Sequence, residues 1–261
     1  MKDLIISAIS NYTPDKIKEY VNSINKCGFT GDKIMICYPI PQNTIDFLKE
    51  NGWELYSMEL KGHPHMKRLI DMYAILREVG DKYRYVISTD VRDVVFQTNP
   101  SEWLEKNLKK QFIVSSENVL YKDEQWGTKN ILEGYGQLLL DRFKNNQSCN
   151  VGVLAGYSKS IKDLLLINYL ISQAGDTQHF TDQSSYNFLV HSEFMKDSIQ
   201  IEDNTGTWAI QLGTHDNPNI LNNYDIETTN HNVTNNGEPF CIVHQYDRVQ
   251  SINTIIRNKY K

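Results

Sequence analysis

Apolar runs and amphipathic segments alternate through the first third of this chain, and this alternation constrains the fold more than any other feature. Segments with apolar residues at helical spacing separate four β-prone runs, at 4–9, 33–38, 54–58 and 83–89. A repeated strand–helix order predicts a largely parallel sheet with helices on its faces, because parallel strands need crossover connections. We therefore expect an α/β, Rossmann-like fold.

The rest of the chain predicts a continuation of the same domain. With 261 residues and 40% hydrophobic residues, the chain can bury one substantial core. Further helices are expected at 100–108, 160–173 and 181–191, and further strands at 111–115, 151–154 and 240–243. Residues 118–149 and 203–237 are rich in polar residues and glycine and predict long connections, which often carry binding residues. We expect a single domain over 1–261.

Two carboxylates follow the fourth β-prone run directly. Asp90 and Asp93 stand where the run 83–89 ends, and a second short apolar run begins at once. A desolvated carboxylate is costly unless something positive meets it, and ligands of parallel sheets bind beyond the carboxyl ends of strands. This pattern predicts a divalent cation, Mn²⁺ or Mg²⁺, that holds a phosphate. The alternative is a surface turn in which Asp93 pairs with Arg92 or Arg84.

Other residues suit the same site. His244 ends an apolar run and offers a neutral imidazole, which favours Mn²⁺ over Mg²⁺. Arg248 lies four residues further on and can reach a diphosphate from the same side. Arg68 stands on the predicted helix before the acidic motif, where it either faces the phosphates or belongs to a solvated helix face. The alternatives are a satisfied histidine at a strand end for His244 and a plain surface arginine for Arg248.

Four separated motifs resemble glycosyltransferases of the GT-A fold. They are Thr89-Asp90-Val91-Arg92-Asp93-Val94-Val95-Phe96-Gln97, Asn150-Val151-Gly152-Val153-Leu154-Ala155-Gly156, Thr181-Asp182-Gln183-Ser184-Ser185-Tyr186-Asn187, and Val243-His244-Gln245-Tyr246-Asp247-Arg248. The chain is most similar to glycogenin-like retaining enzymes and to viral and bacterial sugar transferases with a TDxRDVxFQ variant of the Asp-x-Asp motif. The resemblance covers residues 3–248.

The resemblance implies a donor site for a UDP-sugar. The end of the first strand would hold the base and ribose, through Ala8, Ser10, Asn11 and Tyr12. Asp182 and Gln183 would lie beside the anomeric carbon, although a carboxylate near a helix start is also a common cap. Asn150 would bind sugar hydroxyls, and Gly152 would let the backbone approach the sugar. Arg68, Asp90 and Arg248 would also contact the nucleotide, and Asp90, Asp93 and His244 the metal.

Two departures from the family pattern concern the metal and the phosphates. The residue two positions after Asp90 is Arg92, and the second acid comes one position later, at Asp93. The histidine of the last motif is not followed by the usual glycine and lysine, so Arg248 takes the place of the phosphate-binding lysine. The first departure leaves open which acid binds metal and which binds ribose.

The resemblance implies a hexosyltransferase that acts, with retention, on a hydroxyl of a glycan, a glycolipid or a protein. The acceptor would lie against 118–149 and 203–237. Possible aromatic platforms are Trp126, Tyr135 and Trp208, and lesser acid–base candidates are Glu133 and Asp203. Two alternatives are a non-catalytic carbohydrate- or nucleotide-binding protein derived from this fold and a sugar-nucleotide nucleotidyltransferase. The second would need a glycine-rich basic loop after the first strand, where this chain has Ser10-Asn11-Tyr12-Thr13-Pro14.

Composition excludes several other classes. The net charge of −5 argues against nucleic acid as a partner. No apolar run approaches the roughly 18 residues of a membrane span, and the N-terminal run is too short for a signal peptide. The four cysteines are scattered, which predicts reduced thiols rather than a zinc site. We expect a cytoplasmic protein, in the host cytoplasm if the Asn- and Lys-rich composition is that of a viral genome.

Overall fold

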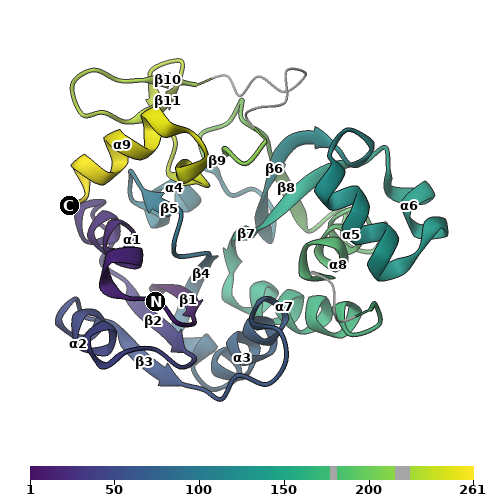
Figure 1. Cartoon of the computed structure of the whole chain (residues 1–261), viewed down its shortest axis with the longest axis horizontal. Helices are drawn as coiled ribbons and strands as arrows, with labels where there is room; N and C mark the ends of the chain where they lie inside the picture. Colours follow the sequence, from purple (N-terminus) through teal and green to yellow (C-terminus); the bar gives the residue numbers. More distant parts are fainter. Residues whose placement is uncertain (177–180, 215–223) are drawn as a thin grey trace.

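The computed structural model describes residues 1–176, 181–214 and 224–261. A seven-stranded sheet forms its centre, with helices on both faces (Figure 1). Its strands, in spatial order, are β3 (Glu54–Ser57), β2 (Asp32–Cys37), β1 (Lys2–Ile9), β4 (Tyr83–Thr89), β7 (Gln147–Tyr157), β6 (Phe112–Leu120) and β8 (Ile199–Glu202). The α/β fold with a mostly parallel sheet is therefore confirmed.

One strand runs against the others. β7 is antiparallel to both of its neighbours, β4 and β6, whereas the pairs β3–β2, β2–β1, β1–β4 and β6–β8 are parallel. Because two reversals restore the direction, β1, β4 and β6 all point their carboxyl ends toward the same edge of the sheet. The amino-terminal half of β7 lies at that edge as well. Residues from four strands can therefore meet there.

Alternating side chains on the strands build a core on each face. Leu4 and Ile6 pack with the helices α3 (Pro64–Val79), α7 (Ser158–Ser172) and α8 (Thr181–Val190). Ile5 faces the other way, toward the helices α1 (Pro14–Lys26) and α4 (Pro100–Asn107). Period-two alternation of side chains explains why one buried run serves both layers. The helix α2 (Gln42–Glu50) packs against α1 and β3.

A small second sheet follows the acidic turn. Its order is β5 (Val94–Phe96), β13 (Ile242–His244) and β9 (Ala209–Gln211). β13 runs antiparallel to β5 and parallel to β9. A hairpin-like sheet of β10 (Asp225–Ile226), β11 (Val233–Asn235) and β12 (Glu238–Pro239) lies near the C-terminal helix α9 (Gln250–Lys259). α9 ends beside α1, where the Asn22 side chain donates to the Tyr260 carbonyl at 3.0 Å.

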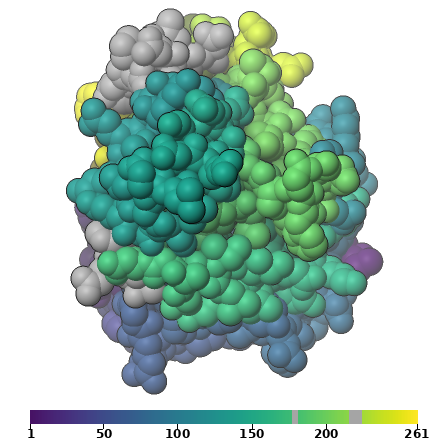
Figure 2. All heavy atoms as spheres, turned by 90° about the vertical axis from the view of Figure 1, so that its right-hand side faces the viewer, coloured from purple at the N-terminus to yellow at the C-terminus, as the bar shows by residue number. Residues whose placement is uncertain are grey.

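The region 118–149 is more regular than the sequence indicated. It contains the end of β6 and the helices α5 (Gln125–Tyr135) and α6 (Gln137–Phe143), which form a lobe at the front of the face in Figure 2. The glycines of this region predicted a loop, but Gly136, at φ +85°, connects α5 directly to α6. Region 203–237 holds β9, β10 and β11, and its part 215–223 lies outside the described residues.

Candidate functional site

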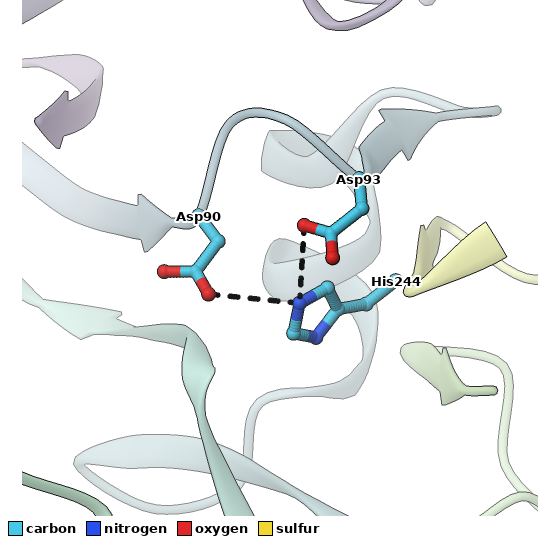
Figure 3. Close-up of side chains that lie close together, drawn as sticks. All are labelled: Asp90, Asp93 and His244. Carbon is cyan, nitrogen blue, oxygen red and sulfur yellow. Dashed lines mark ion pairs between the residues drawn. The ribbon is translucent and has the colours of Figure 1, made fainter. Parts of the chain in front are cut away.

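The two acids after β4 are fixed by backbone contacts on both sides. The Asp90 amide donates to the Gly152 carbonyl on β7 at 2.8 Å. The Asp93 carbonyl accepts from the Gln245 amide, just after β13, at 2.7 Å. The turn that carries both carboxylates is therefore held between the two sheets, and one oxygen of each carboxylate faces the His244 ring (Figure 3).

His244 reaches this turn because of strand register. It pairs with Val94, the residue after Asp93, across the small sheet. Its Nε2 atom lies 3.7 Å from Asp90 Oδ2 and 3.7 Å from Asp93 Oδ1. Two atoms bonded at about 2.1 Å to one cation lie about 3 Å apart at right angles and about 4 Å apart on opposite sides. The spacing of this Asp90–Asp93–His244 triad fits a shared divalent ion.

Gln211 sets the tautomer of His244. It lies opposite His244 in the β9–β13 register, and its Oε1 atom accepts from Nδ1 at 2.7 Å. A carbonyl oxygen can only accept, so a proton sits on Nδ1, and Nε2, which faces the two carboxylates, is the nitrogen left to bind a cation. His244 is 2% exposed. The Gln211 contact thereby orients the imidazole as a candidate nitrogen ligand.

Arg68 links the triad to the second acidic position. Its side chain, on α3, is 11% exposed; the guanidinium donates to Asp90 Oδ1 and, at 3.4 Å, to Asp182 Oδ2. Burial alone would raise the pKa of Asp90, but the Arg68 charge and then His244 outweigh it and hold that pKa far below its usual value. Asp90 is therefore a carboxylate at any physiological pH, with one oxygen on Arg68 and the other toward His244.

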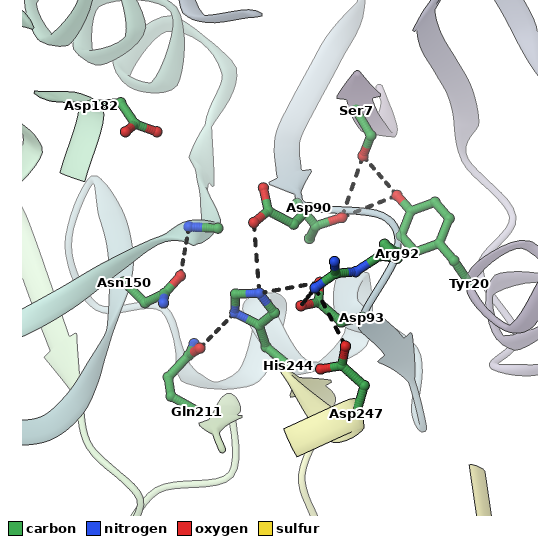
Figure 4. A network of polar contacts seen from close by, with 12 residues as sticks. Ser7, Tyr20, Asp90, Arg92, Asp93, Asn150, Asp182, Gln211, His244 and Asp247 are labelled. Atoms are coloured by element: carbon green, nitrogen blue, oxygen red, sulfur yellow. Dashed lines mark hydrogen bonds and ion pairs between the residues drawn. The ribbon is translucent and has the colours of Figure 1, made fainter. Parts of the chain in front are cut away.

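Arg92 pairs with the other acid of the turn. Its guanidinium donates to Asp93 Oδ2 at 3.1 Å and lies 3.4 Å from Asp247 Oδ2. The pairing of Asp93 with Arg92, considered from the sequence as an alternative to a metal site, thus exists beside the triad, because the two oxygens of Asp93 face different partners (Figure 4). Arg84, the other candidate partner, binds Asp3 instead, at 3.0 Å.

The triad opens into a cavity of about 670 Å³ at the carboxyl ends of β1, β4 and β6. Most of the predicted site residues line it: Ala8, Ser10, Tyr12, Arg68, Asp90, Asp93, Asn150, Gly152, Asp182, Gln183, His244 and Arg248. Asn11 is the exception among them; it is exposed at φ +56° and its amide donates to the Pro39 carbonyl at 2.9 Å. Arg248 is 55% exposed at the side chain.

Gly152 is required by close packing. A Cβ atom there would lie 2.6 Å from His244 Cε1 and 2.7 Å from Asp90 Oδ2. Any side chain would displace two members of the triad. The glycine therefore leaves room for the side chains of the triad; the approach to a sugar that the resemblance implies stays a prediction.

Glu117 is a site residue that the sequence reading missed. It lies near the carboxyl end of β6, lines the cavity and is 6% exposed. It accepts from Ser148 Oγ at 2.5 Å, from Asn150 Nδ2 at 2.7 Å and from Gln183 Nε2 at 3.3 Å. The rule that selected Asp90, an acid at the end of a buried strand, applies here too, but the strand was expected to stop at 115.

These contacts fix the orientation of the side-chain amides of Asn150 and Gln183. Asn150 gives its amino group to Glu117 and accepts from the Gly152 amide at 2.7 Å, so both ends of its amide are engaged within the protein. Gln183 gives its amino group to Glu117 and lines the cavity. Asp182 is 3% exposed and forms an ion pair with Arg68.

Of the predicted aromatic and acid–base candidates, Trp126 alone lines the cavity. Trp208 is fully buried in the core, and the Tyr135 hydroxyl donates to the Ile171 carbonyl at 3.1 Å. Trp126 is 48% exposed and lines the cavity. Glu133 lies near Lys129 at 3.8 Å and Asp203 accepts from Thr205, and neither lines the cavity.

No protein-family model matches the chain, and no curated protein matches it. Among the helices that the structure describes, none has the length and apolar character needed to cross a membrane. The functional argument therefore depends on the geometry of the site.

Proposed function

We propose that this chain is a metal-dependent glycosyltransferase that moves a hexose or deoxyhexose from a UDP-sugar to a hydroxyl group. The observation that carries the proposal is the convergence of Asp90, Asp93 and His244, with one ligand atom from each within 4.8 Å of the others, on a cavity that crosses the sheet edge. Carboxylates and one imidazole suit Mn²⁺, or Mg²⁺ with lower preference.

Charge around the cavity supports a cation bound together with an anion. Five carboxylates (Asp90, Asp93, Glu117, Glu124 and Asp182) and three guanidinium groups (Arg68, Arg92 and Arg248) line it, a formal excess of two negative charges. A divalent cation would neutralise that excess. Arg92 and Arg248 both pair with Asp247, at 3.4 and 3.6 Å, but 44% and 55% of their side chains are exposed, so they would reach a diphosphate at the rim.

The division of labour follows from the positions of the residues. Asp90, Asp93 and Nε2 of His244 would hold the metal, which would stabilise the charge that develops on the leaving diphosphate. Tyr12, at the β1 end, would stack on the base. Asp182 and the Gln183 carbonyl oxygen would face the positive charge that develops at the anomeric carbon.

The transfer step itself requires few protein side chains. The acceptor oxygen forms a bond to the anomeric carbon while the bond from that carbon to the diphosphate oxygen breaks. The diphosphate keeps the electron pair, and the acceptor proton passes to the departing phosphate oxygen. This path retains the anomeric configuration. Arg92 and Arg248 would bind the diphosphate during bond cleavage.

The test measures UDP binding by calorimetry with and without Mn²⁺. We expect Mn²⁺-dependent UDP binding by the unaltered protein and a loss of at least about 100-fold in Asp93→Asn. The matched control is Asp32→Asn, an acid that binds Lys2 far from the cavity. UDP binding that is absent, or equal with and without Mn²⁺, would remove the proposal. Mn²⁺-dependent binding without turnover of any UDP-sugar would instead favour a non-catalytic nucleotide-binding protein.

A further inference from the structure

The cavity has a direction that follows from the order of the strands. Along the sheet edge, Tyr12 follows β1, the acidic turn follows β4, and Glu117 belongs to β6, two strands further on. Figure 4 shows the same order: Arg92 lies on one side of His244, and Asn150 and Asp182 lie on the other. A nucleotide at Tyr12 with its diphosphate at the triad therefore points its sugar toward β6.

Trp126 lies at the end of that path. It stands in the first turn of α5 and lines the same cavity as Asp182 and Gln183. Its ring is 48% exposed, whereas Trp53 is 4% and Trp208 0% exposed. An exposed indole that lines a cavity is a typical anchor for a ligand, because it offers a large rigid apolar surface at small entropic cost.

The backbone of Trp126 is held in place. Its amide donates to Glu124 Oε1 at 2.8 Å, and its carbonyl accepts from Asn130 Nδ2 at 2.8 Å. The Glu124 carboxylate also caps the Gly127 amide, and a Cβ atom at Gly127 would meet Glu124 and Tyr121 at 2.7 and 2.8 Å. The platform is thus built into a rigid helix start, as a specific binding site requires.

We propose that Trp126 forms the acceptor subsite and that the acceptor is a carbohydrate whose pyranose ring stacks on the indole. This inference rests on the proposed function and narrows its acceptor from any hydroxyl to a glycan. A pyranose presents an apolar C–H face and an edge of hydroxyls; the first fits the indole, and the second fits the carboxylate and amide oxygens of Glu117 and Gln183. A lone serine or tyrosine hydroxyl on a protein would use only the polar half of this surface.

The experiment measures saturation transfer from the protein to methyl glucopyranosides, galactopyranosides and mannopyranosides by NMR, each with and without UDP and Mn²⁺. We expect at least one of these sugars to bind the unaltered protein, with the strongest transfer to the C–H protons of one ring face. Trp126→Ala should weaken that binding about tenfold or more, and Trp126→Phe should retain most of it.

Two controls separate the outcomes. Phe194→Ala removes an aromatic ring that is 80% exposed and outside the cavity, and it should leave sugar binding unchanged. UDP–Mn²⁺ affinity of Trp126→Ala should match the unaltered protein, which shows that the variant is folded. If UDP–Mn²⁺ binds but none of the sugars does, or if Trp126→Ala binds them as well as the unaltered protein, the acceptor proposal is wrong while the donor site stands. If sugars bind at Trp126 but UDP–Mn²⁺ does not, the glycosyltransferase proposal fails, and Trp126 is a sugar-binding residue without an acceptor role.

Discussion

Gln211 Oε1 lies 2.7 Å from His244 Nδ1, and this single contact decides which imidazole nitrogen faces Asp90 and Asp93. Both residues are buried, and they are register neighbours in the small sheet. The contact requires that the Gln211 side-chain amide be buried, and it fixes the ring in a tautomer that can bind a cation.

Gln211→Met should weaken Mn²⁺ binding about 10- to 100-fold, because methionine fills the same volume but leaves the imidazole proton without its acceptor. Electron paramagnetic resonance of free Mn²⁺ gives the affinity directly. Gln97→Met is the matched control, since Gln97 bonds to backbone groups of Val233 and Phe240 away from the cavity. Equal Mn²⁺ affinities for the unaltered protein and Gln211→Met would show that the contact does not prepare the ligand.

Asp182→Asn should lower turnover of a UDP-sugar far more than UDP affinity, because the substitution removes charge from beside the transferred sugar and leaves the triad in place. We expect a loss of about 100-fold in kcat. Steady-state rates of UDP release, paired with calorimetry, separate the two effects. Asp71→Asn changes a buried acid on the same helix as Arg68 that bonds to Tyr38 and Lys67, and it serves as the control. Equal losses in kcat and UDP affinity would point to a purely structural role for Asp182.

Glu117→Gln should lower kcat about tenfold or more with little change in UDP–Mn²⁺ affinity. A carboxylate accepts from both Asn150 and Gln183, whereas an amide has only one carbonyl oxygen, so one of the two partner amides must turn. Glu117→Ala leaves three buried donors without an acceptor, and we expect it to reduce the free energy of unfolding by about 2–4 kcal/mol. A Glu117→Gln variant with normal kcat would show that the amide directions do not matter for transfer.

The buried carboxylate of Asp3 makes the free energy of unfolding depend on pH. Burial raises the pKa of Asp3, but hydrogen bonds from Arg84 and from the Tyr85 amide outweigh this and lower that pKa below its usual value. A group with a lowered folded-state pKa stabilises the protein above the unfolded pKa, about 3.9, and loses this effect as pH falls through the folded pKa.

Asp3→Asn should therefore reduce the free energy of unfolding by about 1–3 kcal/mol at pH 7 and pH 5, and by progressively less below pH 4. Urea unfolding at pH 7, 5 and 3.5 gives the three differences. Asp32→Asn removes an exposed ion pair with Lys2 and should change stability by less than about 1 kcal/mol throughout. A difference for Asp3→Asn that stays constant to pH 3.5 would contradict the assignment.

The sequence alone predicted the strands of the first third of the chain. The segments 33–38, 54–58 and 83–89 were placed within one or two residues, because alternation and glycine or proline punctuation determine these elements locally. It also identified Asp90, Asp93 and His244 separately. Their meeting depends on the β5–β13 register, a pairing between residues about 150 positions apart that no local pattern reveals.

Long-range contacts also explain what the sequence reading missed. The antiparallel strand β7 runs from Gln147, although only 151–154 had a clear strand pattern, because its buried polar half is satisfied by Glu117 and Asn187. Arg68 could be assigned to a helix, but its bridge between Asp90 and Asp182 requires α3 and α8 to pack together. The buried ion pairs of this site are tertiary features.

The pairing of β13 with β5 also fixes when the site can form. During synthesis, Asp90 and Asp93 leave the ribosome long before His244, and the nascent chain cannot complete the triad until the strand Ile242–His244 has emerged and added to the small sheet. Assembly of the triad is therefore a late step of biogenesis, and polypeptides released before that strand is translated would lack His244 whatever the state of their central sheet.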